Sequence, residues 1–403
     1  MTKKCNYKIN VIGALDMLRF KNMPKFREAA IEAAPATPLP KSFITNEKAK
    51  QRHPEKQQVV ISEIRNCGVD TKIIILKTEH NEPLASFRAG QYISVSLSIG
   101  GVTTTRPYSL CSSPLDAKHG EYHIMVKRND AGFASLYIHD KWKVGQKLII
   151  SGPQGHLYYE RLRDEKKVVA LAGGSGITPF IGMAYALRDK LEDFELIILY
   201  GSRKEEDITY RKELDEVCAV CDKVKVIYVL SDEDKQGFEH GFITADLIKK
   251  YGGNAFSVFM CGPQAMYNFL DKELEKLSLR KKLVRRELFG MIKDPWNQPD
   301  YPMEIRRKVF NLTVIQCGKE YNISASADEP LLVAIERAGI IAPARCRSGE
   351  CGWCRSKLLS GNVYVPLKTD GRRAADIEFN YIHPCSSFAM SDAVLEVPMS
   401  TQV

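Results

Sequence analysis

The chain has 403 residues, which is long enough for two to four domains with separate cores. Its hydrophobic and charged fractions, 44% and 27%, are those of an ordinary soluble globular protein. The net charge of +9 is not packed into one block, and no basic helix or RNA-type motif is present, which argues against nucleic-acid binding. A basic surface that attracts an acidic protein partner suits this charge at least as well.

Neither an export signal nor a membrane span is expected. The N-terminus MTKKCNYKIN lacks the apolar core of a signal peptide. Residues 168–187 are uncharged and long enough to cross a bilayer, but GGSGITP in their middle is typical of a turn and a helix start. We expect a buried strand, a glycine loop and a helix there. Eleven cysteines without an export signal indicate a reducing compartment, the cytoplasm, where clustered cysteines often bind metal.

Residues 1–55 carry no chemical motif. VIGALDMLRF and FREAAIEAA indicate short amphipathic helices, and APATPLP ends them. We expect an N-terminal helical extension, either a docking arm or a packed appendage.

The next region, residues 56–163, is rich in strand-length apolar runs separated by Gly, Asn and Pro turns. The runs are QVVISEI, TKIIILKT, QYISVSLSI, EYHIMVKR and QKLIISG. Their spacing predicts a small closed or sandwiched β-domain.

From residue 164 to residue 290 the pattern changes to apolar runs that are each followed by a helical segment, which predicts a parallel sheet covered by helices. DPWNQPDYP, within residues 291–305, is typical of a linker. Residues 306–403 begin with an expected hairpin, NLTVIQCGKEYNISAS, followed by the short helix LLVAIERAG and a cysteine-rich loop.

The strongest motif is that loop, CRSGECGWC, with HPCSS further on. The C-x4-C-x2-C pattern and a distant fourth cysteine are the plant-type ferredoxin spacing for a [2Fe–2S] cluster. Gly349 and Gly352 relax the loop, so that backbone N–H groups can reach the cluster sulfurs. A zinc site stays an alternative, although the spacing and the missing second C-x2-C pair disfavour it. The expected metal ligands are Cys346, Cys351, Cys354 and Cys385.

A second motif, RPYSLCSSP, follows an expected strand. Alternation predicts that the side chains of Arg106, Tyr108 and Ser109 lie on one strand face, where they can hold a phosphate, a flat ring and a ring nitrogen. An ordinary exposed strand is the alternative. In VKRNDAGFAS, Gly132 and Ser135 suit a loop that opens a helix, where N–H groups can bind a pyrophosphate.

Two further motifs end strands of the expected parallel sheet. In LAGGSGITP we expect a phosphate-binding loop with Thr178 as N-cap and Pro179 at the first helical position, or else a tight turn without a ligand. In MCGPQAM, Cys261 ends a strand where such sheets bind ligands, although lone cysteines usually serve packing.

The order RPYSL, GFAS, GGSGITP and CGP resembles that of the ferredoxin–NADP reductase superfamily. With the C-terminal cysteine loop, the chain is similar to reductase components that feed oxygenases, of the phenylacetyl-CoA epoxidase and phthalate dioxygenase reductase type. The likeness runs from about Gln58 to Val397. It implies a multidomain protein, whose parts are an N-terminal extension (1–55), an FAD-binding β-barrel (56–163), an α/β parallel-sheet NAD(P)-binding domain (164–290), a linker (291–305) and an α+β, β-grasp [2Fe–2S] ferredoxin domain (306–403).

The resemblance also implies roles for the flavin residues. Arg106 would bind the flavin phosphate, Tyr108 would stack on the isoalloxazine ring, and Ser109 would hydrogen-bond near N5. The G-x-x-S residues favour FAD over FMN, because they match the family's pyrophosphate site. The residues of that site and its flank are Lys127, Gly132 and Ser135.

For the nicotinamide nucleotide, the family's pyrophosphate loop matches Gly173, Gly174, Gly176 and Thr178. Cys261 and Gly262 match the family's cysteine–glycine pair beside the nicotinamide. Glu287 and Phe289 resemble its acid-x-aromatic pair near the flavin, although here the chain continues beyond them. The residues expected to act in catalysis are Ser109, Cys261 and Glu287.

The choice between NADH and NADPH stays open. Ser202, Arg203 and Arg211 can pair with a 2′-phosphate, which favours NADPH slightly. The same GSR sequence occurs in family members that use NADH, and surface arginines are commonly just solvated.

These parts predict an NAD(P)H-dependent reductase. Electrons would pass from NAD(P)H through FAD and the [2Fe–2S] cluster to an electron-accepting redox protein, an oxygenase or another redox enzyme. Arg345, Arg347 and Arg355 flank the cysteine loop and either favour an acidic acceptor surface or are simply solvated. The alternative is a non-catalytic electron-wiring or regulatory component of a larger redox complex, against which the intact GGSGITP and CGP motifs argue.

Overall fold

The structure, a computed structural model, describes residues 18, 20–21, 23–34, 42–68, 70–288 and 290–400. The chain divides into two compact units, Met1–Lys48 and Ala49–Val403. Helix α2 (Met23–Glu32) confirms the second predicted N-terminal helix, whereas the first lies almost wholly outside the described residues.

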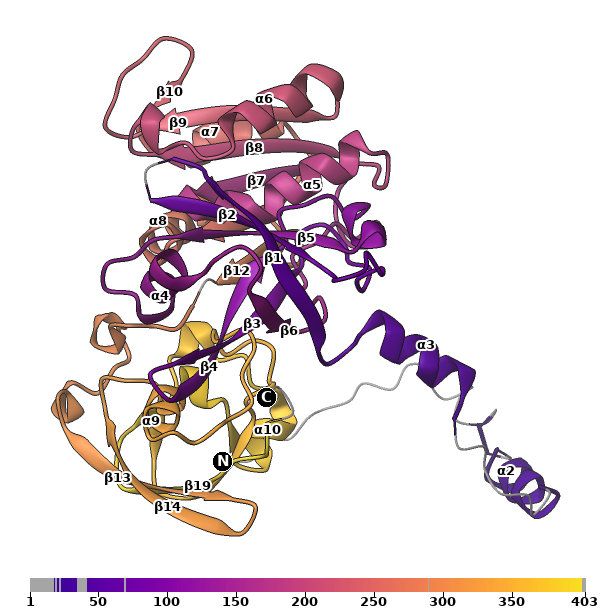
Figure 1. The fold of residues 1–403 in the computed structure, drawn as a ribbon, viewed down its shortest axis with the longest axis vertical. Coiled ribbons are helices and arrows are strands. Elements are labelled where there is room, and N and C mark those ends of the chain that lie inside the picture. Colours follow the sequence, from indigo (N-terminus) through magenta and orange to yellow (C-terminus); the bar gives the residue numbers. More distant parts are fainter. Residues whose placement is uncertain are drawn as a thin grey trace. The chain divides into compact units, whose positions relative to one another are not determined.

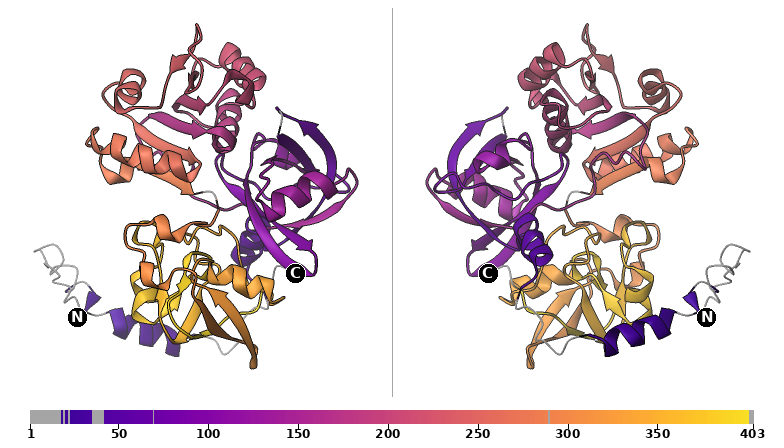
Figure 2. Two further views of the ribbon diagram at one scale, coloured as in Figure 1. Left: turned by 90° about the vertical axis from the view of Figure 1, so that its left-hand side faces the viewer. Right: turned by 90° about the vertical axis from the view of Figure 1, so that its right-hand side faces the viewer.

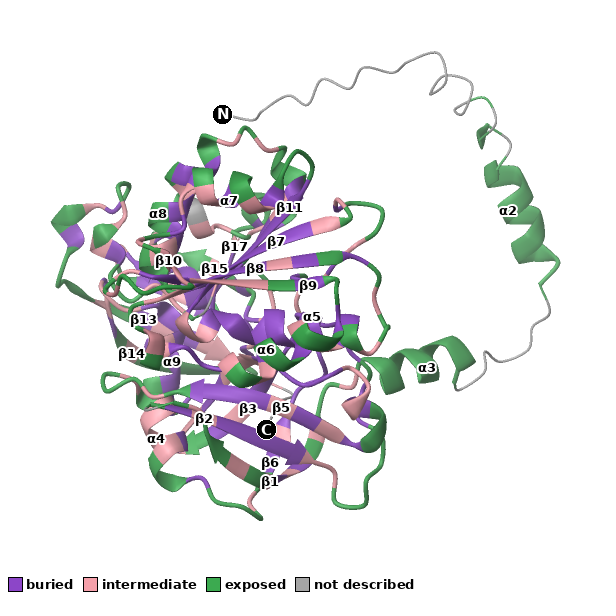
Figure 3. Cartoon of the chain, turned by 90° about the horizontal axis from the view of Figure 1, so that it is seen from above, coloured by how far each residue is buried: buried purple, intermediate pink, exposed green. Residues whose placement is uncertain are grey.

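Helix α3 (Ile44–Arg52) was not predicted from the sequence, because ITNEKAKQR has no apolar stripe. Neither α2 nor α3 buries a residue, and both are coloured as exposed along their length (Figure 3).

Three main sheets occupy separate parts of the second unit (Figures 1 and 2). The first has the order β4-β3-β6-β1-β2-β5, and its neighbouring strands are antiparallel. Its strands are β1 (Gln57–Asn66), β2 (Thr71–Lys77), β3 (Tyr92–Ile99), β4 (Val102–Ser109), β5 (Glu121–Lys127) and β6 (Lys147–Ile150).

A bridge from Leu110 to Ile124 joins the chain just after β4 to β5. Since β4 and β5 are the two edge strands, this bridge closes the sheet into a barrel and excludes the open sandwich. The barrel interior is filled by apolar side chains that alternate along the strands, among them Ile74, Ile93 and Val95, and α4 (Phe133–Lys141) packs against it.

The second sheet is parallel, with the order β10-β9-β8-β7-β11-β12. Its strands are β7 (Lys167–Gly173), β8 (Glu195–Ser202), β9 (Val224–Leu230), β10 (Glu239–His240), β11 (Ser257–Gly262) and β12 (Val284–Leu288). The helices between them are α5 (Thr178–Arg188), α6 (Arg211–Val220), α7 (Ala245–Gly252) and α8 (Gln264–Glu275).

Helices cover both faces of this sheet, which explains its continuous apolar runs. Along β7, Val168 and Ala170 belong to the core beneath α5 and α6, while Val169 and Leu171 belong to the core beneath α7 and α8. The strand order reverses between β7 and β11, and the motifs GGSGITP and CGP follow these two strands. Both motifs therefore lie at the point where such sheets bind ligands.

The third sheet has the order β14-β13-β19-β15-β17, with β13 and β19 parallel and the other pairs antiparallel. Its strands are β13 (Val309–Gln316), β14 (Lys319–Ser326), β15 (Ser356–Ser360), β17 (Tyr381–Ile382) and β19 (Ala393–Glu396). Strands β16 (Val363–Tyr364) and β18 (Phe388–Ala389) pair separately, and two short helices complete this part, α9 (Leu331–Arg337) and α10 (Ala374–Glu378).

Helix α9 packs Leu331 and Ile335 against Leu312 and Leu395 of the mixed sheet. This α+β arrangement, with the barrel and the parallel sheet, confirms the predicted fold class. No helix in the described ranges is both long and apolar enough to cross a membrane, and residues 168–187 form β7, a turn and α5 as predicted.

The segment predicted as a linker packs against the third part of the chain. Tyr301 and Ile305 are buried with Tyr364 and Phe388. The Tyr301 hydroxyl donates to Asp328 Oδ1 at 3.0 Å, and its ring meets that of Tyr364 edge-on. This segment therefore contributes apolar contacts in addition to connecting two sheets.

We expect Tyr301→Ala to lower the free energy of unfolding of this part by about 3 kcal/mol, because it removes a buried ring. Tyr301→Phe, the matched control, keeps the ring, loses only the hydroxyl with its hydrogen bonds to Asp328 and Ala327, and should cost about 1 kcal/mol. Urea unfolding of the full chain, followed by visible circular dichroism of the bound cofactors, measures both. Equal stability of Tyr301→Ala and the unaltered chain would contradict the packing described here.

Candidate functional site

The cysteine loop connects α9 to β15, and Cys385 lies in the turn before β18. Cys354 Sγ and Cys385 Sγ are 3.4 Å apart, although the two residues belong to distant segments. The loop needs glycine at Gly349, whose φ is +86° and where an added Cβ would lie 2.5 Å from Ser386 Oγ. Tight turning of the loop thus brings its sulfurs toward the fourth cysteine.

Backbone N–H groups point at these sulfurs. Gly349 N donates to Cys385 Sγ at 3.2 Å, and Cys351 N donates to Cys346 Sγ at 3.4 Å. Such donors stabilise the negative charge of thiolates and bridging sulfides. In the described part of the chain no three His, Cys, Asp or Glu side chains surround one point as a single-ion site needs. The donor set fits a two-iron cluster, which spreads four thiolates over two irons.

His383 supports the loop and was not singled out from the sequence, although HPC stands beside Cys385. Its Nδ1 lies 2.6 Å from Gly349 O, and its Nε2 lies 3.8 Å from Asp376. The imidazole therefore ties the loop to α10.

The arginines that flank the loop do not share one role. Arg347 is 1% exposed, so the prediction of a solvated or acceptor-facing side chain is wrong for it. It is buried because Glu336 neutralises its charge. Arg355 is exposed and paired with Asp376 at 3.0 Å, and Arg345 stacks over the ring of Trp353.

On the flavin strand, the register corrects one expectation. Tyr108 pairs with Ile93 and Arg106 with Val95, whereas Ser109 pairs with Tyr92. Because side chains alternate along a strand, Arg106 and Tyr108 share one face and Ser109 lies on the other. The predicted single face is wrong for Ser109, which adjoins Tyr108 in sequence.

The polar groups of this strand suit a flavin. Arg106 forms no ion pair with an acidic side chain among the described residues, and desolvation, more than the nearby Arg347 charge, lowers its pKa to about 10. Ser109 Oγ is buried and has no hydrogen-bond partner in the same part of the chain. A cation and a hydroxyl are thus left for a ligand.

The turn before α4 also fits a phosphate-binding group. Gly132 is the N-cap of α4, and a Cβ there would meet Ser135 Oγ at 2.4 Å and Asn129 O at 2.9 Å. Lys127 is the last residue of β5 and lies just before this turn. No side chain caps the first turn, so its N–H groups are available to an anion.

The nucleotide loop comes within contact distance of β11. Gly173 ends β7, Gly174 has a φ of +50°, and a Cβ at Gly176 would lie 2.0 Å from Cys261 O. A Cβ at Gly262 would lie 2.6 Å from Met266 Sδ. Only glycines allow the two motifs to approach this closely.

Thr178 is not the N-cap of α5, and the prediction from the sequence is wrong on this point. A 3-10 turn from Gly174 to Ile177 runs directly into α5, so Ile177 is the N-cap and Thr178 and Pro179 are the first two helical residues. Thr178 Oγ1 donates to Ser175 O at 3.0 Å and thereby braces the loop.

The residues expected near a 2′-phosphate differ in availability. Ser202 Oγ is buried without a partner among the described residues. Arg203 is 77% exposed and only weakly paired with Asp207 at 3.6 Å. Arg211 already pairs with Glu205 and lies 5.0 Å from the Phe238 ring centre.

One small cavity is lined by residues of all three parts. They are Tyr92, Pro107 and Ser109 of the barrel, Glu287 and Leu288 of the parallel sheet, and Cys346, Ser348 and Glu350 of the cysteine loop. Cys261 lies beside Glu287, its partner on the neighbouring strand. Gly132, Ser135, Arg203 and Arg211 do not line this cavity, and Phe289 lies outside the described residues.

The cavity holds two carboxyl groups with raised pKa values. Burial, and next the charge of Glu350, raises the pKa of Glu287, and neither of its oxygens has a partner in the described part. Local desolvation raises the pKa of Glu350 to about 7, although the residue is exposed overall, and the charge of the Cys346 sulfur adds to the effect. Burial also raises the pKa of the fully buried Cys261 thiol. Sequence reasoning missed Glu350, which lies inside the cysteine motif.

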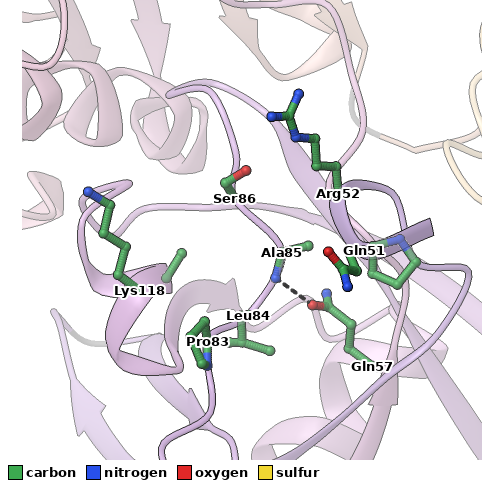
Figure 4. Close-up of a pocket in the computed structure, with 10 residues that line it drawn as sticks. Gln51, Arg52, Gln57, Pro83, Leu84, Ala85, Ser86 and Lys118 are labelled. Carbon is green, nitrogen blue, oxygen red and sulfur yellow. Dashed lines mark hydrogen bonds between the residues drawn. The ribbon is translucent and has the colours of Figure 1, made fainter. Parts of the chain in front are cut away.

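A larger cavity of about 670 Å³ lies elsewhere, between the end of α3 and the barrel (Figure 4). Gln57 braces it by accepting a hydrogen bond from Ala85 N, while Arg52 and Lys118 are among its lining residues. None of the residues predicted from the sequence to form the site lines this cavity.

Three family models match the chain, namely an oxidoreductase FAD-binding domain over residues 58–159, an oxidoreductase NAD-binding domain over residues 170–272 and a 2Fe-2S iron-sulfur cluster binding domain over residues 314–390. The NADH-cytochrome b5 reductase 1 of Dictyostelium discoideum is 30% identical over 222 residues, which are 53% of this chain and 76% of that protein. The chain belongs to the ferredoxin–NADP reductase superfamily.

Relatives with the same three parts are also found. A component of the 1,2-phenylacetyl-CoA epoxidase of Escherichia coli K12 is 26% identical over 322 residues, 77% of this chain and 88% of that protein. A glycine betaine monooxygenase reductase of Pseudomonas aeruginosa is 25% identical over 77% of this chain and 87% of that protein. The solved structure of phthalate dioxygenase reductase shares the fold, with a TM-score of 0.62 and 24% identity over 85% of this chain and 98% of that one.

This member of the superfamily is an NAD(P)H oxidoreductase with FAD and a [2Fe–2S] cluster as cofactors, as the sequence predicted. It passes electrons from NAD(P)H through these cofactors to a redox partner.

We expect Cys385→Ser to lower the iron and acid-labile sulfide content of anaerobically purified protein at least about tenfold, because a thiolate ligand is lost. Flavin content should not change, since Cys385 belongs to a different part of the chain. Cys317→Ser is the matched control, because Cys317 is an exposed cysteine in the hairpin turn of the same sheet. Full cluster content in Cys385→Ser would contradict the assignment.

Proposed function

We propose that this reductase supplies electrons to an oxygenase component, and that the cavity shared by Ser109, Glu287 and Cys346 lies where its three electron-handling parts meet. That cavity is the observation that carries the proposal, because each of the three residues comes from a different part of the chain. When bound, the flavin accepts a hydride from NAD(P)H and the cluster carries single electrons onward.

The residues of the flavin strand take separate roles in this proposal. Arg106, which lacks an acidic partner among the described residues, binds the flavin phosphate. Tyr108 lies against the ring, and Ser109 donates its hydroxyl to a ring nitrogen. Gly132 and Ser135 open α4, whose free N–H groups bind the pyrophosphate.

On the nucleotide side, the glycine loop and the end of β11 form one surface. Gly173, Gly174 and Gly176 let the backbone reach a pyrophosphate, and Thr178 braces the loop. Cys261 and Gly262 lie beside the nicotinamide ring. Glu287 closes the cavity from the next strand, where its raised pKa favours a protonated carboxyl that can donate a hydrogen bond.

For the cluster, the proposed ligands are the four cysteines Cys346, Cys351, Cys354 and Cys385. The N–H donors on Cys346 Sγ and Cys385 Sγ support this choice. The domain boundaries at residues 56, 164, 291 and 306 are part of the same proposal and are supported by the extents of the three sheets.

The oxygenase partner is inferred from the relatives. Two of them are named as parts of an epoxidase and of a glycine betaine monooxygenase. A reducing location, the cytoplasm, is supported by the cysteines of the described part, none of which forms a disulfide.

The test of this function uses two electron acceptors. Anaerobic NADPH or NADH should bleach the flavin and cluster bands of the purified chain, which should then reduce both ferricyanide and cytochrome c. Cys385→Ser should keep ferricyanide reduction within about twofold and lose cytochrome c reduction at least about tenfold, because only the route through the cluster is broken. A colourless preparation, or equal loss with both acceptors, would contradict the proposed route.

The partner is tested separately, by affinity capture on the immobilised holoprotein. The captured protein should consume oxygen when the reductase and NAD(P)H are supplied together, and should consume none when either is omitted. Capture of a redox protein that never consumes oxygen would be consistent with the reductase function but would contradict the proposal that the partner is an oxygenase.

Nucleotide choice is tested at Arg203. We expect Arg203→Ala to raise the KM for NADPH about tenfold and to leave the KM for NADH unchanged, because one charge-assisted hydrogen bond to a 2′-phosphate is lost. Arg188→Ala, which removes a paired arginine at the far end of α5, is the matched control. Equal effects on both nucleotides would exclude a 2′-phosphate contact.

A further inference from the structure

A buried charge cluster joins the cysteine loop to the flavin strand. Arg347, which follows Cys346 in sequence, is 1% exposed and has a positive φ of 58°. Its Nη1 donates to Glu336 Oε1 at 2.6 Å and its Nη2 donates to Glu336 Oε2 at 2.7 Å. This two-pronged contact ties the loop to α9, because Glu336 lies on that helix and is 5% exposed.

The same cluster extends to the barrel through Thr104 on β4. Thr104 Oγ1 accepts from Arg347 Nη1 at 3.2 Å and donates to Glu336 Oε1 at 2.9 Å. It also accepts from Arg106 Nη1 at 2.5 Å. The hydroxyl thus uses its one donor and both acceptor positions, whereas Arg347 Nε has no hydrogen-bond partner in the described part of the chain.

A neighbouring hydrogen bond reinforces the connection. Thr105 Oγ1 donates to the carbonyl oxygen of Ala344 at 2.8 Å, just before the first cysteine of the loop. Adjacent residues of β4 therefore hold the segment that begins the cysteine motif.

The position of Thr104 on β4 links the cysteine loop to the flavin residues of the same strand. Side chains alternate, so Thr104 shares its face with Arg106 and Tyr108. A short chain of contacts therefore runs from the proposed flavin residue Arg106 through Thr104 to Arg347 and its sequence neighbour Cys346.

The energetics indicate that this charge cluster orients the cysteine loop against the barrel more than it stabilises the fold. Taking the Arg347 guanidinium and the Glu336 carboxylate out of water carries a desolvation cost that often cancels their mutual attraction. Apolar side chains of similar size would hold the two parts together equally well, but without a fixed hydrogen-bond geometry. Charged groups with directional bonds fix the loop in one position.

We propose that Thr104, Glu336 and Arg347 form a positioning clamp that sets the distance between the flavin strand and the cluster loop, and thereby the rate of electron transfer between the two bound cofactors. The inference rests on the proposed function of the site. Each transfer removes one electron from the reduced flavin and converts one ferric iron to ferrous iron, and the clamp residues neither gain nor lose electrons. Because electron tunnelling falls exponentially with distance, a small displacement of the loop changes the rate strongly.

The test compares Thr104→Val with Thr104→Ser in the full chain with its cofactors. In anaerobic stopped flow, reduction of the flavin by NAD(P)H should stay within about twofold of the unaltered protein in both variants. Cluster reduction should slow at least about tenfold in Thr104→Val and recover in Thr104→Ser, which restores the hydroxyl. Thr103→Val, on the other face of the same strand, is the matched control and should behave as the unaltered protein.

Three readouts do not depend on turnover. The iron content and the electron paramagnetic resonance spectrum of the dithionite-reduced cluster should be unchanged in Thr104→Val, because the cluster ligands are untouched. Amide hydrogen exchange should increase at residues 344–347 and in β4, because the contact between them loosens. Thr105→Val, which removes only the bond to Ala344, should show a smaller change in the same direction and replaces Thr104→Val if that variant does not fold.

Three outcomes would overturn the clamp. They are an unchanged cluster-reduction rate in the valine variants, no rescue by Thr104→Ser, and loss of iron or flavin from variants that still fold, which would indicate a merely structural contact. Failure of the proposed function appears differently, as an unaltered protein whose cluster NAD(P)H does not reduce. In that case hydrogen exchange still decides whether the contact holds the loop.

Discussion

The contact between β4 and the cysteine loop constrains the rest of the structure. Electrons pass between two buried cofactors only if the protein segments that bind them lie close together. Here these segments, β4 and the cysteine loop, are far apart in sequence. Thr104, Glu336 and Arg347 join them. The directional hydrogen bonds among these buried groups favour one orientation of the barrel against the ferredoxin part.

Close backbone approach imposes a second constraint, at the nucleotide loop. The turn after β7 and the end of β11 come so near that a side chain at Gly176 would collide with the carbonyl of Cys261. The two segments are close because β7 and β11 are neighbouring parallel strands, and the strand order reverses between them, where such sheets bind ligands. Glu287, on the neighbouring β12, then extends the nucleotide side toward the cavity that Ser109 and Cys346 also line.

Local sequence patterns predicted a large part of this protein. Strand-length runs separated by turn residues predicted the β-domain, and continuous apolar runs each followed by a helical segment predicted the parallel sheet, because helices cover both faces of such a sheet. The cysteine spacing predicted the [2Fe–2S] cluster, and the order of four short motifs predicted the flavin and the nicotinamide nucleotide through the family resemblance that it carries. The errors concerned single residues, whose placement the short motifs did not determine. Ser109 lies on the face opposite Tyr108, and a 3-10 turn displaces Thr178 from the cap of α5.

The sequence by itself determined most of the elements and the cofactor motifs, because these depend on periodicity and on spacing along the chain, and the resemblance that the motifs carry indicated the class of reaction. Only the tertiary structure decided that Arg347 is an interior residue, that Tyr301 belongs to a core, and that Glu287 and Glu350 share a cavity. A sequence does not reveal which charged side chains lose their water, because desolvation depends on neighbours that the fold brings from distant parts of the chain.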